Sequence, residues 1–371
     1  MPGAMASPGQ AVAPGAERPP ATVRREARAM GSPLRLQVRA GAPAQAIDAA
    51  WAAIVEEFEL VEQALSRFRE TSEIHRLRLA GGHADHPSRR LVAALVAADR
   101  ARRLTAGRFD PRVLLDLERL GSAPLPIPPP LAAHALTSAP WQATPPMDRS
   151  GPLFTRDGRA GPIDVPDPVD FGGIGKGLAL RWAATRAAWH VGTAPFLIEE
   201  GGDIVARGGP GPDGWRIGIE RPPPVTGNDP APLASDVGTR GDPGTMDDLA
   251  PMVVVELPVA GGAIATSSVR RARWHAADGR PVHHLLDPVT GEPGGDGLLA
   301  VTVAAADPAW AEVWSKTLFL EGRDAIASRA RHCDLAAWWI TDRGEIEMTP
   351  RARQLTSWVA GESGRTAGES G

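Results

Sequence analysis

The sequence of 371 residues contains one cysteine, no tyrosine and no long apolar run. Because Cys333 has no second cysteine to pair with, an internal disulfide is excluded. No segment approaches the roughly 18 consecutive apolar residues that suggest a membrane-spanning helix, so we expect no membrane span. Lys and Arg number 40 against 44 Asp and Glu, a formal net charge of −4. A chain without excess positive charge is a poor partner for nucleic acid.

The first residues also lack targeting features. They contain no basic stretch followed by an apolar one, and no cysteine that could accept a lipid, so we expect a cytoplasmic protein. Residues 1–22 are rich in Pro and Gly and are expected to be disordered, as is the polar tail 361–371. A Pro-, Gly- and Asp-rich stretch at 221–248 reads as a surface insertion within one domain, 23–360.

Two hydrophobic periods occur in this domain. Apolar residues recur at helical spacing in two segments, Pro43–Glu70 and Leu91–Leu104. Short runs that alternate or are rich in β-branched residues predict strands at Leu34–Val38, Trp215–Ile219, Val253–Leu257 and Leu299–Ala304. Because strands and helices do not alternate regularly, the pattern favours an α+β fold over a doubly wound parallel one.

The segment Asp170–Gly177, DFGGIGKG, precedes an apolar helical run and is the densest candidate site. Glycines let a backbone approach a ligand closely, and a helix N-terminus directs N–H groups toward an anion such as phosphate. Lys176 at the helix start opposes the helix dipole unless an anion is present. The alternative is a tight turn with a surface lysine, since the spacing matches neither the Walker loop nor the dinucleotide fingerprint.

Four further segments carry candidate residues, each with a plain structural alternative. Glu199–Ile204 is either a hairpin bend or backbone packed against a ring system. Gly107–Pro111 contains a helix stop, and the Asp before Pro is expected to point its carboxylate outward. His283–Gly291 could orient or deprotonate a nucleophile or form a turn; zinc is disfavoured because no other ligands stand at suitable spacing. In Ala311–Thr317, Glu312 and Lys316 are four apart, as in an ordinary helical ion pair.

The order of these motifs resembles the ApbE family of FAD:protein FMN transferases over roughly residues 28–322. The matching pieces are Met30–Ser32, Leu65–Arg69 with Ser72, Glu73 and Leu77, Gly107–Pro111, Asp170–Gly177, Gly201–Asp203, Ala265–Ser267, His284–Gly291 and Ala311–Phe319. The resemblance implies an α+β flavin-transferase domain that binds FAD in an extended cleft, with Mg²⁺ on the pyrophosphate. It also implies transfer of FMN to a Ser or Thr hydroxyl of a flavoprotein with an FMN-binding domain, releasing AMP.

The resemblance also implies roles for individual residues. His284 and Asp287 correspond to the pair nearest the phosphoryl chemistry. The flavin-nucleotide contacts correspond to Met30, Phe68, Arg108, Phe109, Asp110, Asp170, Lys176, Leu285 and Ser315. The metal corresponds to the carbonyl of Gly173 and to two positions on the last helix, Glu312 and Lys316.

The last helix departs from the family pattern, which has Asp and Thr at these two positions. Glu312 can still bind a hard cation, whereas a protonated Lys316 has no lone pair. One interpretation is that Lys316 joins the catalytic group and itself neutralises the pyrophosphate, reducing the need for Mg²⁺. The departure also keeps two other functions open: hydrolysis of FAD to FMN and AMP, and FAD binding without catalysis.

Overall fold

The computed structural model describes residues 22–39, 41–122, 149, 151–158, 160–209, 214–220, 251–269 and 272–361. Apart from Thr22 and Gly361, the predicted N-terminal segment 1–22, the insertion 221–248 and the tail 361–371 lie outside these residues.

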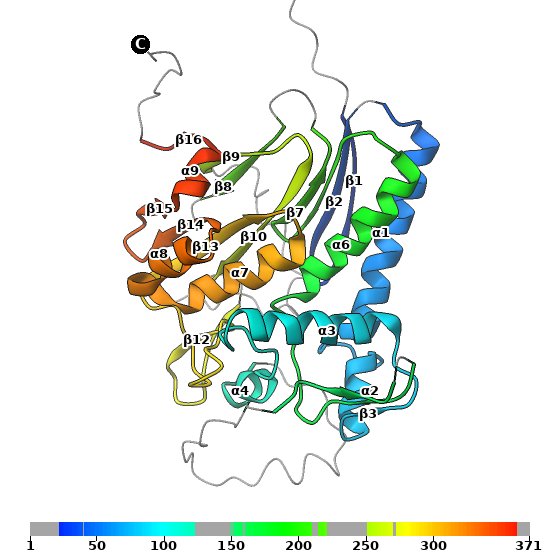
Figure 1. The fold of residues 1–371 in the computed structure, drawn as a ribbon, viewed down its shortest axis with the longest axis vertical. Coiled ribbons are helices and arrows are strands. Elements are labelled where there is room, and N and C mark those ends of the chain that lie inside the picture. The colour runs from blue at the N-terminus through cyan, green and yellow to red at the C-terminus, as the bar shows by residue number, and fades with distance from the viewer. Residues whose placement is uncertain are drawn as a thin grey trace, which may run out of the picture.

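An antiparallel sheet of eight strands forms the centre of the fold (Figure 1). Its order is β1-β2-β6-β7-β10-β13-β14-β15. The strands are β1 (Thr22–Ala29), β2 (Ser32–Arg39), β6 (Phe196–Glu200), β7 (Asp203–Arg207), β10 (Gly261–Ser268), β13 (Leu298–Ala305), β14 (Ala336–Thr341) and β15 (Ile346–Met348). The β6–β7 connection is the two-residue hairpin Gly201–Gly202, with φ of 55° and 89°, as the bend interpretation predicts.

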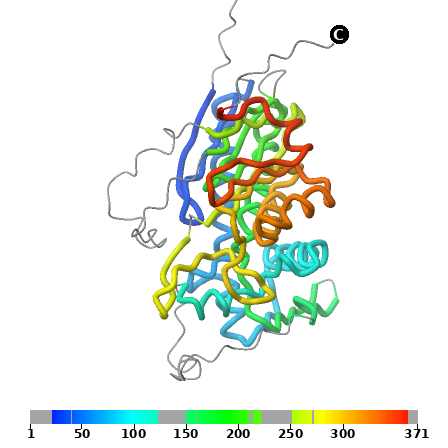
Figure 2. The backbone as a smooth tube through the Cα atoms, turned by 90° about the vertical axis from the view of Figure 1, so that its left-hand side faces the viewer, coloured from blue at the N-terminus to red at the C-terminus, as the bar shows by residue number. Residues whose placement is uncertain are grey.

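Helices cover one face of this sheet, and a second sheet covers the other (Figures 1 and 2). Successive residues of a strand point to opposite faces. On β6, Phe196 and Ile198 therefore pack with the helices, while Leu197 packs with the second sheet. The helices are α1 (Ala44–Leu65), α6 (Gly175–Val191), α7 (Pro308–Leu320) and α8 (Gly322–His332), and the second sheet is β16 (Thr356–Val359), β9 (Pro251–Leu257) and β8 (Trp215–Glu220).

Shorter elements lie beyond one end of the central sheet (Figure 1). Helix α3 crosses this end, with α2, α4 and two small sheets beside it. These elements are α2 (Glu73–Leu79), α3 (Arg89–Leu104), α4 (Leu114–Arg119), the sheet β3 (His83–Ala84), β5 (Ile163–Asp164) and β4 (Thr155–Arg156), and the pair β11 (Arg273–His275) and β12 (Pro281–His283); α9 (Pro350–Gln354) lies near the C-terminal strands.

The predicted α+β class is confirmed, as are the strands at β2, β8, β9 and β13 and the helix at α3. The helix predicted over Pro43–Glu70 ends earlier, at Leu65, because Ser66 adopts extended geometry with φ −73° and ψ 120°. Within the described residues, no helix combines the length and apolarity needed to cross a bilayer.

Candidate active site

The N-terminal end of α6 meets α7 above α3 in Figure 1, and Lys176, Glu312, Ser315 and Lys316 lie on these two helices. Gly177 makes the crossing possible, because a Cβ there would lie 2.5 Å from the carbonyl oxygen of Pro308 and from Cα of Ala309. Any other residue at position 177 would force the two helices apart. The glycine of the DFGGIGKG segment nearest α7 is thus required for packing.

Lys176 lies between two buried carboxylates. Its ammonium pairs with Asp203 and lies 3.7 Å from Oε1 of Glu312. The other carboxylate oxygen of Glu312, Oε2, accepts a hydrogen bond of 2.7 Å from the Gly177 N–H. Burial raises the pKa of Glu312, and Lys176 acts in the opposite direction. The protein thus supplies the anions that a lysine at a helix start requires, so Lys176 is not a free surface lysine.

Lys316 is the second lysine of the site, and its side chain is only 8% exposed. It packs over Gly173, where a Cβ would lie 2.7 Å from Cδ and 3.1 Å from Nζ of the lysine. The expected ion pair with Glu312 is wrong: Glu312 reaches Gly177 and Lys176 on α6 instead. Among the described residues, no carboxylate oxygen forms an ion pair with Lys316 within 4.0 Å.

Arg67 and Asp170 complete this charged region. Their side chains lie 3.6 Å apart, and Asp170 also accepts a hydrogen bond of 3.2 Å from the Gly172 N–H. The guanidinium of Arg67 lies 4.2 Å from the ring centroid of Phe68, whose side chain is 60% exposed. An exposed aromatic held beside a cation is available to stack on a heterocycle.

Asp110 does not point outward as expected. Its carboxylate accepts hydrogen bonds from the guanidinium of Arg112, at 3.0 Å from Nε and 2.7 Å from Nη2, and from the Arg112 backbone N–H. Phe109 is also buried, and its ring lies beside Gly173. The chain turns inward here because the guanidinium of Arg112 is itself buried and requires a counter-charge.

His284 is neutral at physiological pH. Burial lowers its pKa to about 3, assisted by the nearby charges of Lys316, His283 and Lys176. Its Nδ1 lies 3.4 Å from the carbonyl oxygen of Ala272. A carbonyl can only accept a hydrogen bond, so this contact places the proton on Nδ1 and leaves the lone pair of Nε2 free to accept a proton.

Asp287 lies in the same loop but pairs with Arg108. Nη1 of Arg108 donates to Asp287 at 2.8 Å, and the Val289 N–H donates to the other carboxylate oxygen at 2.8 Å. Arg108 also lies 3.6 Å from Glu321. Asp287 therefore fixes the loop to Arg108, and its described contacts are not with the imidazole of His284.

The remaining predicted contacts differ in exposure. Met30 occupies the β1–β2 turn with φ 48°, and its N–H donates to Glu62 at 2.9 Å. Ser315 is fully buried and bonds to Ser267 and to the Glu312 carbonyl. Leu285 lies inside the hydrophobic cluster between β13 and α7. The side chains of Ser315 and Leu285 thus face the protein interior.

Sequence reasoning missed three residues of this region: Arg67, Arg112 and Asp203. Arg67 and Asp203 lie within the segments Leu65–Arg69 and Gly201–Asp203, and Arg112 directly follows Gly107–Pro111. A basic residue after a helix and an acidic residue after a Gly-Gly hairpin are common, so local pattern alone could not single them out. Arg67 and Asp203 pair with Asp170 and Lys176, which belong to another motif. Arg112 pairs with Asp110, two residues before it.

The protein groups at the predicted metal position do not fit Mg²⁺, which is usually bound through one or two available carboxylates together with waters and substrate phosphates. Two buried carboxylate oxygens lack hydrogen bonds, Oδ2 of Asp203 and Oε1 of Glu312, but both face the ammonium of Lys176. Of the other two predicted positions, Gly173 offers a single backbone carbonyl and Lys316 is a cation. Within the described part of the chain, no group of three His, Cys, Asp or Glu residues could hold a metal ion.

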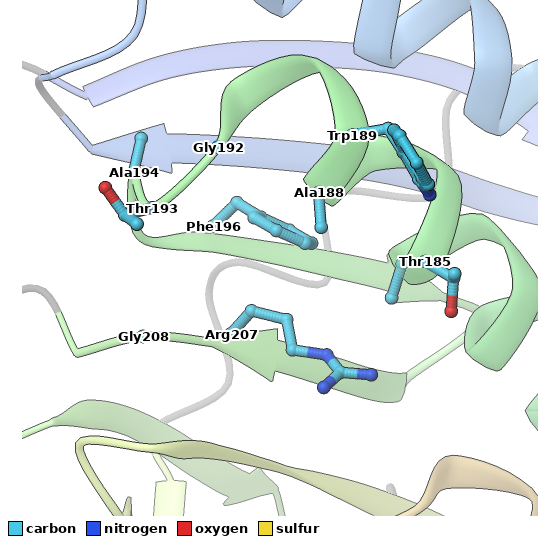
Figure 3. A pocket seen from close by; sticks show the side chains of 10 residues that line it. Thr185, Ala188, Trp189, Gly192, Thr193, Ala194, Phe196, Arg207 and Gly208 are labelled. Carbon is cyan, nitrogen blue, oxygen red and sulfur yellow. The ribbon is translucent and has the colours of Figure 1, made fainter.

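A cavity of about 650 Å³ lies at the opposite end of α6 (Figure 3). Thr185, Trp189, Phe196 and Arg207 are among the residues that line it, and none of the predicted site residues does. A smaller cavity of about 450 Å³ adjoins the site, with Gly107, Asp110 and Pro288 in its wall. Of the predicted site residues, only Asp110 is part of its lining.

Comparisons with known proteins identify the family. A model of the ApbE family matches residues 30–339. The FAD:protein FMN transferase of Klebsiella pneumoniae (strain 342) is 29% identical over 202 residues, covering 54% of this chain and 50% of that protein. The FAD:protein FMN transferase of Salmonella typhimurium is 28% identical over 308 residues, covering 80% and 78%. The match thus spans about half the length of the Klebsiella relative.

Solved structures share the fold. The ApbE protein of Thermotoga maritima superposes with a TM-score of 0.68 at 24% identity, covering 90% of this chain and 99% of that one. The flavin transferase ApbE from Vibrio cholerae gives a TM-score of 0.64 at 21% identity, covering 91% and 100%.

Proposed function

The chain belongs to the ApbE family, and we propose that it transfers the FMN part of FAD to a Ser or Thr hydroxyl of a partner flavoprotein, with AMP as the leaving group. The observation that carries this proposal is that Lys316, which has no ion pair among the described residues, lies near the neutral imidazole of His284 and the paired cations Arg67 and Lys176. A transferring phosphoryl group requires positive charge and a proton acceptor at one place.

The residues of this chain suggest a division of labour in the reaction. The acceptor oxygen forms a bond to the FMN phosphorus, the bond from that phosphorus to the bridging oxygen breaks, and AMP departs with the bond electrons. His284 receives the hydroxyl proton at Nε2. Burial and the nearby charges of Lys316 and Lys176 lower its pKa, and the dinucleotide's negative charge would raise it toward the range useful for a base. Phe68 offers an exposed ring for stacking on the flavin.

The direct test is to incubate the protein with FAD and a panel of FMN-binding acceptor domains, then measure the intact mass of each acceptor. We expect an FMN-sized increment on one acceptor, and none when its Ser or Thr is replaced by Ala. Release of AMP at a rate that acceptors do not change would indicate hydrolysis instead. FAD that stays intact with every acceptor would indicate binding without catalysis.

His284→Asn separates catalysis from binding. The proposal predicts a fall in transfer rate of about 100-fold or more, the range for removal of a general base, with FAD affinity retained within a few-fold. An equal loss of rate and affinity would assign His284 to binding alone.

A further inference from the structure

Lysine is almost absent from this chain, and its two positions coincide with the site. Of the 40 basic residues, 38 are arginine, and the two lysines are Lys176 and Lys316. Arginine and lysine are not interchangeable: the ammonium is a compact point charge, whereas the guanidinium is a planar fork. Both lysines of the chain are therefore among the predicted site residues, where each offers a compact cation.

The two lysines differ in how their charges are used. Lys176 is neutralised by Asp203 and Glu312 of the protein itself. Lys316 is buried without an ion pair among the described residues, and the carboxylates of Asp170 and Glu312 act on it only from a greater distance. A buried cation without a partner costs stability, so an arrangement of this kind points to a ligand that supplies the missing anion.

The surroundings of Lys316 favour a phosphate as that anion. Its Nζ lies beside Gly173, two residues before the start of α6, a helix of 17 residues. The N-terminus of such a helix attracts anions, and Arg67 contributes a further positive charge nearby. Lys176 pairs with Asp203 and partly offsets the charge of Glu312, which limits the repulsion that these carboxylates exert on a phosphate at this point.

We propose that the ammonium of Lys316 binds a phosphate oxygen of FAD directly and takes the place of a divalent cation, so that this chain binds its dinucleotide without Mg²⁺. The identity of the ligand as FAD rests on the proposed function. The rest of the proposal follows from the chemistry of Lys316. Its ammonium cannot be a ligand of Mg²⁺, but it can donate hydrogen bonds to an anion. In the transfer step, the ammonium would neutralise the charge that develops on the departing AMP phosphate.

The test measures binding of FAD and of riboflavin, which lacks the phosphates, by flavin fluorescence in EDTA and in Mg²⁺. For wild type we expect FAD to bind equally, within about twofold, under both conditions. Lys316→Met keeps the stem and removes the charge; it should weaken FAD binding by about 10- to 100-fold in EDTA and leave riboflavin binding unchanged. Lys316→Thr restores an oxygen ligand and should make FAD binding depend on Mg²⁺.

A matched control removes a cation from the other half of α6. Arg186 pairs with Glu56 and Glu57, away from the site. Arg186→Met should therefore leave FAD binding in EDTA unchanged, even if it lowers the melting temperature.

Two results would overturn the proposal: wild-type FAD binding that is lost in EDTA, or a Lys316→Met variant that binds FAD as tightly as wild type. These outcomes are distinct from failure of the proposed function. A protein that binds FAD through Lys316 in EDTA but flavinylates no acceptor would retain the phosphate site and lose the transferase assignment.

Discussion

Arg112 and Lys316 are both buried cations near the site, yet their surroundings are opposite. The side chain of Arg112 is 1% exposed, and its guanidinium meets Asp110, Asp167 and the backbone carbonyls of Arg149 and Gly151. Lys316 has no such set of partners among the described residues. The protein itself thus supplies the hydrogen-bond and ion-pair partners of the Arg112 guanidinium, whereas the Lys316 ammonium is left to bind a group that the protein does not contain.

The pKa values of the two groups follow this difference. Burial by itself would lower the pKa of Arg112, but Asp110 and Asp167 outweigh it and raise the pKa. Burial lowers the pKa of Lys316, and the carboxylates of Asp170 and Glu312 do not compensate. A buried charge whose partners come from the protein stabilises the fold, whereas a buried charge without such partners indicates where a ligand completes the site.

Removing Arg112 from its cluster with Asp110 and Asp167 should change stability more than any other substitution considered. Arg112→Met leaves Asp110 buried without its partner, and we expect the free energy of unfolding to fall by about 3–5 kcal/mol. Urea denaturation with and without FAD measures this. Because the cluster is structural, the loss should be the same in both conditions; a loss seen only with FAD would place Arg112 in the ligand site.

Glu312→Gln tests the surroundings of Lys316, and we expect a smaller change in free energy than for Arg112→Met. The amide oxygen can still accept from the Gly177 N–H, but one negative charge beside Lys176 and Lys316 is gone. FAD in EDTA should therefore bind about 3- to 10-fold more tightly, as expected for one nearby charge at a partly solvated site. If Glu312 is instead a metal ligand, the same variant will bind FAD more weakly in Mg²⁺.

The smallest expected effect is a loss of stability at acidic pH, caused by the neutral imidazole of His284 near Lys316. The unfolded chain takes up a proton on His284 near pH 6.5, whereas the folded chain resists it until about pH 3. Stability contributed by the neutral ring is therefore present above pH 6.5 and falls as the pH drops below it. Because His284 is only half-buried by its accessible surface, solvent weakens the effect of burial on its pKa, and we expect less than about 1 kcal/mol at pH 5.5.

Comparing urea midpoints at pH 7.0 and 5.5 for wild type and His284→Asn checks this value. The variant should lose less stability on acidification than wild type. Identical pH dependence would show that His284 is protonated as readily in the folded chain as in the unfolded one.

Much of the fold could be predicted because its signals are local. Helix α3 begins and ends within two residues of the predicted segment. Its apolar periodicity and its N-cap Ser88 are both properties of residues that are neighbours in the sequence. The Gly201–Gly202 hairpin likewise follows from two adjacent glycines. The order of the motifs was enough to indicate the family, even though each motif alone was ambiguous.

The pairing of charges could not be predicted, because it depends on contacts between distant segments. Glu312 and Lys316 have ideal spacing for a helical ion pair, yet Glu312 extends across to α6 and meets Lys176. Asp110 was expected to face outward, but Arg112 two residues later holds it inside. In the first case tertiary packing overrode a local rule worth only a few tenths of a kcal/mol. In the second, contacts of Arg112 with the distant residues Arg149 and Asp167 keep its guanidinium, and with it Asp110, inside.

The most direct test of the central claim is a thermodynamic cycle on Lys316→Met, measured as unfolding free energy with and without FAD in EDTA. Without FAD, removal of the buried charge should stabilise the variant by about 1–3 kcal/mol. With FAD, the stabilisation gained from the ligand should be smaller than in wild type by about 1.4–2.7 kcal/mol. Equal stabilisation of both proteins by FAD, or a variant that is less stable without it, would contradict the account.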